Sequence, residues 1–350
     1  MKGRCLLSDE PVVGQQEQLK VTVLMSVFNG ARWLQESIES ILAQSFPNFE
    51  FIIVDDGSQD TSIEIIRRYA AADPRIRVIV KPNSGLADSL NVGIEAAQGE
   101  WIARIDADDI AMPNRLAMQL AHATRDEKCV ALGSAWIRID DQGRECGVVS
   151  VPVHCDQLCR LMVARRVNPI AHSSAFIRTA AVRAVGCYRT RIRRSQDFDL
   201  WLRLSEVGTL KAIDYPLVRI RAHAAQISNE NGGLQQIVDG RVALASFMLR
   251  RDGLKDPVSE EATAEQFREF WHFVQDSVKA NRYHEYRKFV ADIRADLASR
   301  SVFRGIRGVF SALRAPRFLI RLVGIRVFGD RLTGRIVKDW IEQGKRRCAE

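Results

Sequence analysis

The sequence lacks several features that would place the protein in a membrane or outside the cell. No run of about 18 apolar residues is free of charge, so no spanning helix is predicted. The apolar stretch near Met1 is too short for a signal peptide. The seven cysteines form no Cys-x-x-Cys pair, and an odd number without a secretion signal predicts free thiols in a reducing compartment. We therefore expect a cytoplasmic protein with a packed core.

Internal repeats, low-complexity tracts and nucleic-acid-binding motifs are also absent from the sequence. No nucleic-acid partner is therefore expected. A hydrophobic content of 46% and a charged content of 27% are ordinary for a globular protein, and 350 residues are ample for a sizeable core.

Net charge is missing from most of the chain and concentrated at its C-terminal end. The whole chain carries +8, and residues 301–350 alone, with 12 basic and 4 acidic residues, also carry +8. Apolar residues follow helical spacing within this tail, which predicts an amphipathic helix on an anionic membrane surface. Packing of the tail against the rest of the chain or a second protomer is the alternative.

Short apolar runs alternate with helical patterns in the first third of the chain. This alternation predicts an α/β fold with a mainly parallel sheet and helices on both faces. We expect strands near 21–27, 50–54 and 77–80 and one entering Asp106, with helices near 31–44, 60–72 and 84–97. Later strands are expected at 130–139 and 148–153, and helices at 234–251, 261–280 and 284–299.

Acidic clusters follow two of the expected strands. Asp55 and Asp56 come after one apolar run, and Asp106, Asp108 and Asp109 after another. Carboxylates at the carboxyl ends of parallel strands line the crevice where open α/β sheets bind ligands. Three carboxylates within four residues repel one another unless a cation joins them, and hard oxygen ligands suit Mg²⁺ or Mn²⁺ carrying a diphosphate. The alternative is that these residues cap helices and turns.

Six segments of the chain, taken together, resemble the family 2 inverting glycosyltransferases, which have the Rossmann-like GT-A nucleotide-sugar-binding fold. The resemblance covers about residues 20 to 230. The matching segments occur in the family's order and with plausible spacing, at 21–30, 54–61, 83–93, 106–109, 195–203 and 219–228.

The resemblance implies a division of the chain into three parts. An N-terminal extension, 1–19, precedes a GT-A catalytic domain at 20–230. Within that domain, the nucleotide-sugar half is expected at about 20–110 and the acceptor half at about 111–230. A helical C-terminal region, 231–350, ends in the basic amphipathic tail 301–350.

A donor site is expected around the ends of the first strands. Phe28 would contact a uracil ring, where the family often has Tyr, or else pack in the core. Asp55 or Asp56 would accept a hydrogen bond from a base N–H, which favours uracil, thymine or guanine over cytosine. Arg104 either reaches the donor or pairs with a neighbouring Asp. The expected nucleotide-binding residues are Val27, Phe28, Asn29, Asp55, Asp56, Asn83, Gly85, Asn91, Arg104 and Asp106.

The resemblance also assigns the metal site. It makes Asp108 the direct ligand of Mn²⁺ or Mg²⁺ and Asp106 a ribose contact or an outer contact of the metal. His223 resembles a family histidine near the diphosphate or metal, and a structural histidine is its alternative. The cation would neutralise charge that develops on the departing diphosphate.

An inverting transfer needs one general base on the acceptor side. Asp197 matches the family's base, with a helix cap as its alternative role. Gln196 stands where the family often has Glu, and Asp199, two residues along the same helix, should point elsewhere. His172 resembles a residue of a loop that borders the acceptor site.

The sequence therefore predicts an inverting glycosyltransferase that uses a nucleotide sugar, UDP-linked by preference. The expected acceptor is a saccharide or lipid-linked saccharide in cell-surface polysaccharide synthesis. Peripheral attachment at the inner face of the cell membrane would follow from the tail. A catalytically inactive saccharide-binding or scaffold protein on the same fold and a nucleotidyltransferase are the alternatives.

Overall fold

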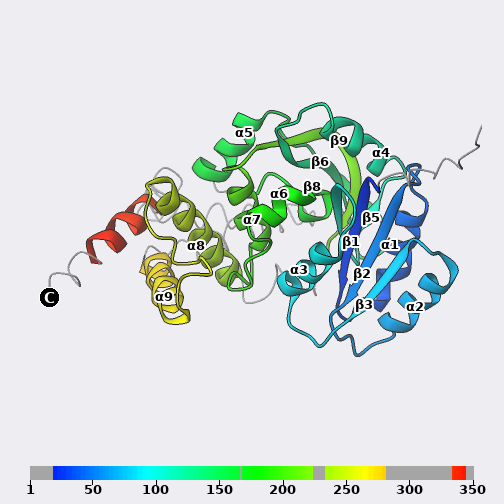
Figure 1. Cartoon of the computed structure of the whole chain (residues 1–350), viewed down its shortest axis with the longest axis horizontal. Coiled ribbons are helices and arrows are strands. Elements are labelled where there is room, and N and C mark those ends of the chain that lie inside the picture. Colours follow the sequence, from blue (N-terminus) through cyan, green and yellow to red (C-terminus); the bar gives the residue numbers. More distant parts are fainter. Residues whose placement is uncertain (1–18, 166–167, 224–232, 281–332, 344–350) are drawn as a thin grey trace, which may run out of the picture.

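The protein is described from a computed structural model that covers residues 19–165, 168–223, 233–280 and 333–343 (Figure 1). The expected helix at 284–299, most of the N-terminal extension and most of the basic tail lie outside these residues. The part of the 219–228 match that follows His223 also lies outside them. In the described part of the chain, no helix has the length and hydropathy that crossing a membrane requires.

The described strands form a single mixed sheet in the order β3-β2-β1-β4-β8-β6-β9-β5, with β7 paired to β6. The pairs β3/β2, β2/β1, β1/β4 and β6/β9 are parallel, whereas β8 and β5 run antiparallel to their neighbours. The mainly parallel α/β fold is confirmed. The first strands are β1 (Val21–Val27), β2 (Phe49–Asp55), β3 (Ile76–Val80), β4 (Trp101–Asp106) and β5 (Ile110–Ala111).

Helices cover both faces of the sheet, as predicted. The alternating side chains of β1 divide the core, because Val23 faces the α1 and α2 side whereas Leu24 packs with Leu90 of α3. The Gly93 backbone in α3 lies so close to Leu24 that an added Cβ would be 2.1 Å from a Leu24 methyl group. These helices are α1 (Ala31–Leu42), α2 (Ser62–Ala72) and α3 (Leu86–Ala96).

The second half of the sheet is built around two long strands, β6 (Cys129–Ile139) and β9 (Thr209–Arg221), which run side by side. The sequence predicted β6 but not β9, whose buried positions are interrupted by exposed or half-buried ones such as Asp214 and Tyr215. The strand expected at 148–153 is wrong in its bounds, since β7 spans Glu145–Val149. The remaining elements here are α4 (Arg115–Ala123), α5 (Cys155–Arg160), the π-helix η1 (Leu161–Arg165), the 3-10 turn η2 (His172–Ser174), β8 (Phe176–Arg178), α6 (Thr179–Ala184) and α7 (Gln196–Leu204).

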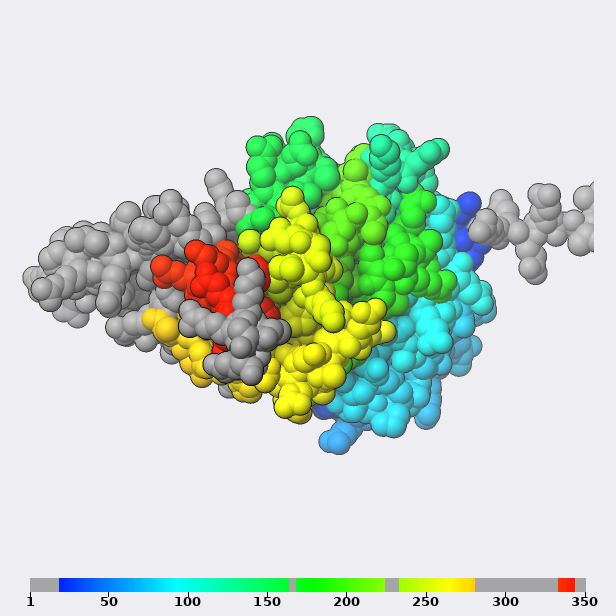
Figure 2. Space-filling view, turned by 60° about the vertical axis from the view of Figure 1, so that its left-hand side comes forward, coloured from blue at the N-terminus to red at the C-terminus, as the bar shows by residue number. Residues whose placement is uncertain are grey.

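The helices after residue 233 join the rest of the chain through α7. Helix α8 (Leu234–Arg251) matches its predicted bounds, and α9 (Ala264–Ala280) begins three residues after its predicted start. A further helix at 333–343 lies beside them, and its Trp340 ring lies 5.1 Å from the ring of Phe270 (Figures 1 and 2). This described part of the basic tail therefore packs within the chain.

Candidate active site

Strand register brings the two acidic clusters to one edge of the sheet. Val27 at the end of β1 pairs with Asp55 of β2, and Ser26 pairs with Asp106 of β4. Because these strands are parallel, their carboxyl ends meet at this edge, where open α/β sheets bind ligands.

The loop after β1 is fixed by hydrogen bonds to the loop after β2. Asn29 has a left-handed backbone with φ of 52°, its amide donates to Ser58 Oγ, and its side-chain oxygen accepts from the amide of Gln59. Asp60 accepts from the amides of Ala31 and Ser62, and so joins the starts of α1 and α2. Phe28, 51% exposed, stands at the rim of this rigid loop pair, where a base could stack.

Asp56 organises the loop that leads into α3. Its carboxylate accepts from Lys81 Nζ at 2.6 Å and from the amides of Ser84 and Gly85. Burial raises the pKa of Asp56, but these donors outweigh burial and the net pKa is lowered. Gly85 has a φ of 97°, a conformation that favours glycine. Asn83 lies in the same loop, directly before Ser84.

Asp55 and Asn91 differ in how much hydrogen-bonding capacity they retain. Asp55 is 2% exposed; its Oδ2 accepts from the Ser58 amide, whereas its Oδ1 is buried with no hydrogen-bond partner in the described chain. Asn91 uses both ends of its amide on the backbone of Tyr188, so it joins α3 to the loop that contains Tyr188. Asp55 therefore keeps one buried carboxylate oxygen without a partner in the described chain, whereas the amide of Asn91 is fully used.

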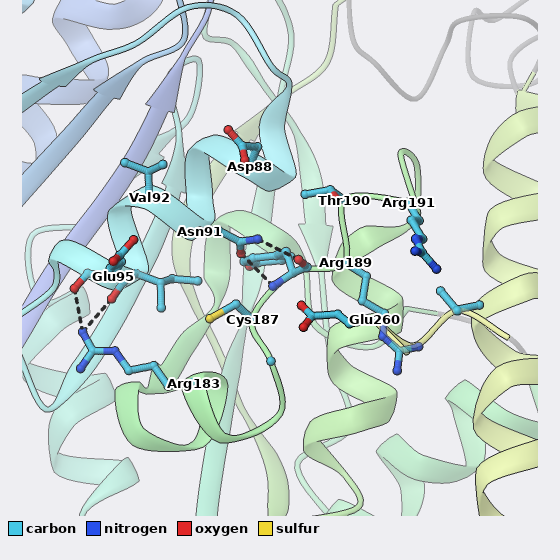
Figure 3. Close-up of a pocket in the computed structure, with 14 residues that line it drawn as sticks. Asp88, Asn91, Val92, Glu95, Arg183, Cys187, Arg189, Thr190, Arg191 and Glu260 are labelled. Atoms are coloured by element: carbon cyan, nitrogen blue, oxygen red, sulfur yellow. Dashed lines mark hydrogen bonds between the residues drawn. The ribbon is translucent and has the colours of Figure 1, made fainter. Parts of the chain in front are cut away.

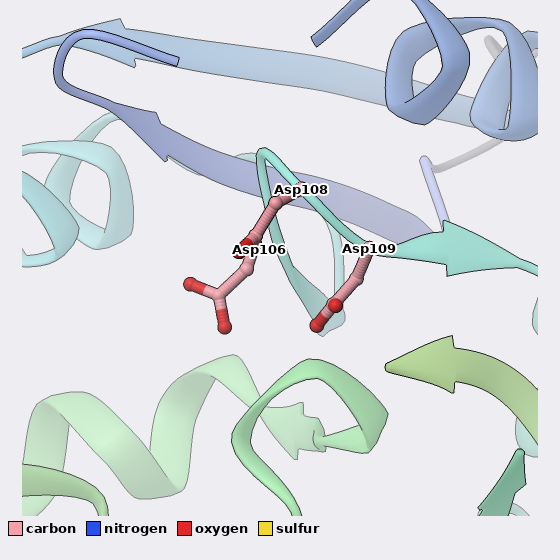
Figure 4. A group of neighbouring side chains, drawn as sticks. All are labelled: Asp106, Asp108 and Asp109. Atoms are coloured by element: carbon pink, nitrogen blue, oxygen red, sulfur yellow. The ribbon is translucent and has the colours of Figure 1, made fainter. Parts of the chain in front are cut away.

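Three carboxylates converge in the turn between β4 and β5 (Figure 4). One carboxylate oxygen from each of Asp106, Asp108 and Asp109 lies within 4.8 Å of the other two. Burial raises the pKa of Asp108 and Asp109, and the charges of the neighbouring carboxylates raise it further. A divalent cation would relieve this repulsion, and oxygen donors suit Mg²⁺ and Mn²⁺, so the residues fit the expected metal.

Asp106 is held differently from the other two carboxylates. Arg104, 2% exposed, donates through both terminal nitrogens to Asp106, and Ser173 Oγ donates at 2.9 Å. Burial raises the pKa of Asp106, but the charge and hydrogen bonds of Arg104, the effect of His172 and the hydrogen bond from Ser173 together outweigh burial, and the net pKa is lowered. Arg104 therefore pairs with the neighbouring Asp, one of its two expected roles, and Asp108 retains more capacity to bind a cation.

His223 contacts the carboxylate of Asp108, which the family resemblance makes the expected metal ligand. Its Nε2 lies 2.7 Å from Asp108 Oδ2, and its ring lies 4.4 Å from the Trp33 ring of α1. Arg221 donates from its backbone to Asp109 and from Nε to the Asp108 carbonyl oxygen. The end of β9 thus fixes the acidic turn. Arg221 lies within the matching segment 219–228, but neither Arg221 nor Trp33 was assigned a role in the site from the sequence.

The expected general base lies at the start of α7. Asp197 accepts from Asn168 Nδ2 at 2.5 Å and from the Phe198 amide, and burial raises its pKa despite these donors. Ser195, the residue before the helix, has a φ of 57°, and Gln196 is 7% exposed. Asp199 is buried and paired with Arg203 and Arg189, so it is engaged in structural contacts.

His172 and Tyr188 lie close to both the acidic turn and the base. His172 Nε2 lies 2.7 Å from the Tyr188 hydroxyl. Burial lowers the pKa of His172 well below its usual range, and the Arg104 charge lowers it further, so the ring is neutral near pH 7. The charge of Asp106 acts on both His172 and Tyr188, and that of Asp197 acts on Tyr188. His172 and Tyr188 therefore share one electrostatic environment with the acidic turn.

Sequence reasoning missed several residues that complete this site. Ser173, Tyr188 and Asn168 have ordinary polar side chains, and their roles arise from contacts across 67, 16 and 29 positions of the chain. The sequence showed Asp109 to be part of the acidic cluster, but Asp109 was not predicted to be a metal ligand. Its adjacency to Asp108 was the available signal.

Comparison with solved structures identifies the class of fold. The chain superposes on residues 1–349 of TarS from S. aureus in complex with UDP-GlcNAc, with a TM-score of 0.52 and 17% identity, over 84% of this chain and 91% of that one. The corresponding complex with UDP gives a TM-score of 0.51 at 16% identity, with the same coverage. The protein therefore has the GT-A fold.

Sequence comparison places the chain in a family. The sequence model of glycosyl transferase family 2 matches residues 22–178. EpsE of Bacillus subtilis, named provisionally as a glycosyltransferase, is 38% identical over 195 residues, which cover 54% of this chain and 68% of EpsE. The hyaluronan synthase of Pasteurella multocida is 24% identical over 234 residues, 67% of this chain and 23% of the synthase. The chain belongs to glycosyl transferase family 2 and is a glycosyltransferase.

Proposed function

We propose that the protein is an inverting, metal-dependent glycosyltransferase that uses a UDP-sugar. Its acceptor would be a saccharide or lipid-linked saccharide in cell-surface polysaccharide synthesis. The observation that carries the proposal is the cluster of the Asp106, Asp108 and Asp109 carboxylates in the turn after β4. Asp197, at the start of α7, is the proposed base.

The donor assignment is supported by the loops at the ends of β1 and β2. Phe28 offers an exposed ring for a base, and Asp55 offers an unpaired carboxylate oxygen that suits the ring N–H of uracil. TarS, the neighbour with the same fold, binds UDP and UDP-GlcNAc. A nucleotide sugar based on uracil is the donor class that these features favour.

Asp108 and Asp109 would hold Mn²⁺ or Mg²⁺, with Asp106 as an outer contact held by Arg104. His223 would set the orientation of the Asp108 carboxylate through their 2.7 Å contact. The bound cation would supply Lewis-acid stabilisation of the diphosphate leaving group.

Asp197 would accept the proton of the acceptor hydroxyl as that oxygen attacks the anomeric carbon from the face opposite the diphosphate. Its raised pKa makes it a stronger base than an exposed carboxylate, while the Asn168 amide keeps the charged form populated. Neutral His172, joined to Tyr188, would border the acceptor.

The cellular setting is proposed from the sequence of the tail. A net charge of +8 within residues 301–350 would hold the enzyme at the anionic inner face of the cell membrane, in the cytoplasm, where a lipid-linked acceptor would be found. The names of two relatives, EpsE as a glycosyltransferase and the hyaluronan synthase of Pasteurella multocida, support an acceptor in polysaccharide synthesis.

Donor hydrolysis tests the proposal without knowledge of the acceptor. Purified protein is assayed with a panel of nucleotide sugars in Mn²⁺, Mg²⁺ or EDTA. We expect turnover of a UDP-sugar that needs the metal and falls by orders of magnitude in Asp108→Asn, whereas the exposed Asp276→Asn matches wild type. A binding or scaffold protein would turn over nothing, and full activity in EDTA would exclude the metal role.

A further inference from the structure

A cavity lies outside the acidic turn and the nucleotide loops. Its volume is about 850 Å³, it is open to solvent, and it is lined by α3, the loop 186–191 and residues near Val258 (Figure 3). Asp88, Asn91 and Glu95 line it from α3, and Arg189 and Thr190 line it from the loop. A cavity of this size can enclose a ligand of several rings.

The walls of this cavity are fixed by contacts within the protein. Arg183 donates to the carbonyl oxygens of Ile94, Glu95 and Ala97 at the end of α3. Asn91 holds Tyr188, and Arg191 donates to the carbonyl oxygens of Ser259 and Ala262. The cavity is therefore pre-formed, so little free energy would be lost in ordering its walls when a ligand binds.

Acidic and basic side chains line the cavity in equal number. Asp88 is paired with Lys81 at 3.1 Å and Arg189 with Asp256 at 2.7 Å. The other charged lining residues are two acids, Glu95 and Glu260, and two bases, Arg183 and Arg191. Such a wall offers charged donors and acceptors without a net field, which suits hydroxyl groups because each can both donate and accept. Strongly anionic ligands would meet the two Glu carboxylates.

The cavity adjoins the active site at two points. Tyr188 is part of its lining, and the hydroxyl of Tyr188 lies against His172 beside the acidic turn. Asp88, at the other end, lies within hydrogen-bonding distance of Ser84 and pairs with Lys81, which binds Asp56 of the nucleotide loop. A chain-like ligand in the cavity could therefore extend toward the transfer site.

We propose that this cavity is a subsite for the acceptor, one that binds the sugar units of a neutral oligosaccharide beyond the unit that receives the transferred sugar. This assignment rests on the proposed function, since it makes the cavity part of the acceptor path. The half-buried side chain of Val92 would contact the C–H face of a ring, and the charged side chains would contact the hydroxyl groups.

The test measures saccharide binding to the full-length protein by saturation-transfer-difference NMR. The probes are maltohexaose, cellohexaose and chitohexaose, with hexagalacturonate as the anionic counterpart. Thr190→Trp fills the cavity from an exposed position, and Thr124→Trp, exposed at the end of α4, is the matched control. If Thr190→Trp fails to fold, the exposed pair Glu95→Gln and Glu260→Gln replaces it.

We expect at least one neutral hexasaccharide to bind with a Kd on the order of 1 mM. Thr190→Trp, or its replacement, should weaken that binding at least tenfold, whereas Thr124→Trp should leave it unchanged. Hexagalacturonate should bind more weakly than the neutral probes. The subsite is refuted if no neutral probe binds, if binding survives in the cavity variant, or if the anionic probe binds best.

Donor hydrolysis separates this result from the proposed function. Hydrolysis uses water as the acceptor, so Thr190→Trp should retain the wild-type rate. If the wild type hydrolyses no nucleotide sugar, the proposed function fails even where the probes bind. If hydrolysis is normal but the binding pattern fails, only the subsite is wrong.

Discussion

Asp256 should stabilise the fold by joining the helical region to the loop before the proposed base. Its Oδ2 accepts from Arg189 at 2.7 Å and Arg250 at 2.6 Å, and its Oδ1 accepts from Ser246 and the Val258 amide. Arg189 in turn lies 3.6 Å from Asp199 of α7. Burial raises the pKa of Asp256, but Arg189 and the hydrogen bonds outweigh it and lower the pKa to about 2.

The size of this effect follows from linkage. The fall from the ordinary value of 3.8 to about 2 corresponds, at roughly 1.4 kcal/mol per pKa unit, to about 2.5 kcal/mol. Because the folded-state pKa is depressed, this stabilisation is fully present above about pH 4 and is lost as the pH falls from 3.8 toward 2. Asp256→Asn should therefore lower the free energy of unfolding by roughly 2–3 kcal/mol at pH 7.

Urea unfolding followed by tryptophan fluorescence at pH 7, 5, 4 and 3 measures this difference. The unfolding curves of wild type and Asp256→Asn should be equally far apart at pH 7 and pH 5 and closer together at pH 3, where part of the stabilisation is lost. The exposed Asp252→Asn, at the end of α8, serves as the control and should match wild type throughout. Equal stability of wild type and Asp256→Asn at pH 7, or a gap that stays constant down to pH 3, would refute the linkage.

Further predictions concern the base, its amide partner and the tail. Asp197→Asn should abolish transfer yet leave UDP-sugar binding, measured by calorimetry, nearly intact. A parallel loss of donor affinity would show that Asp197 is a structural or nucleotide-binding residue instead. Transfer should fall in acid through a pKa above 3.8, and Asn168→Ala should move this limb of the pH–rate profile to higher pH, because it removes a donor to the carboxylate. A chain ending at Ser299 should be less stable, since it loses Ile336 and Trp340 from the helical core. The shortened chain should also fail to float with anionic liposomes at low salt, whereas the full-length chain should float. Equal flotation of the two chains would show that the tail does not bind the membrane.

Much of the architecture could be read from the sequence because local pattern and burial agree there. The apolar runs at β1, β2 and β4 are buried on both sides, as a parallel sheet requires, and the helix at Leu234–Arg251 ends where its pattern ends. Strand β9 escaped prediction because its pairing with β6 is irregular and its burial mixed. Its place in the sheet is set by its neighbours and not by its own periodicity.

The sequence by itself also determined which residue types end the strands, and hence the acidic turn, because parallel strands bring their carboxyl ends to one edge. Only the tertiary structure decided how each carboxylate is used. Arg104 pairs with Asp106 and Lys81 with Asp56, while Asp108 contacts His223, which follows β9 and lies 115 positions further along the chain. The pKa of a carboxylate and its freedom to bind a ligand depend on burial and on neighbouring charges, which long-range packing brings together and no local pattern encodes.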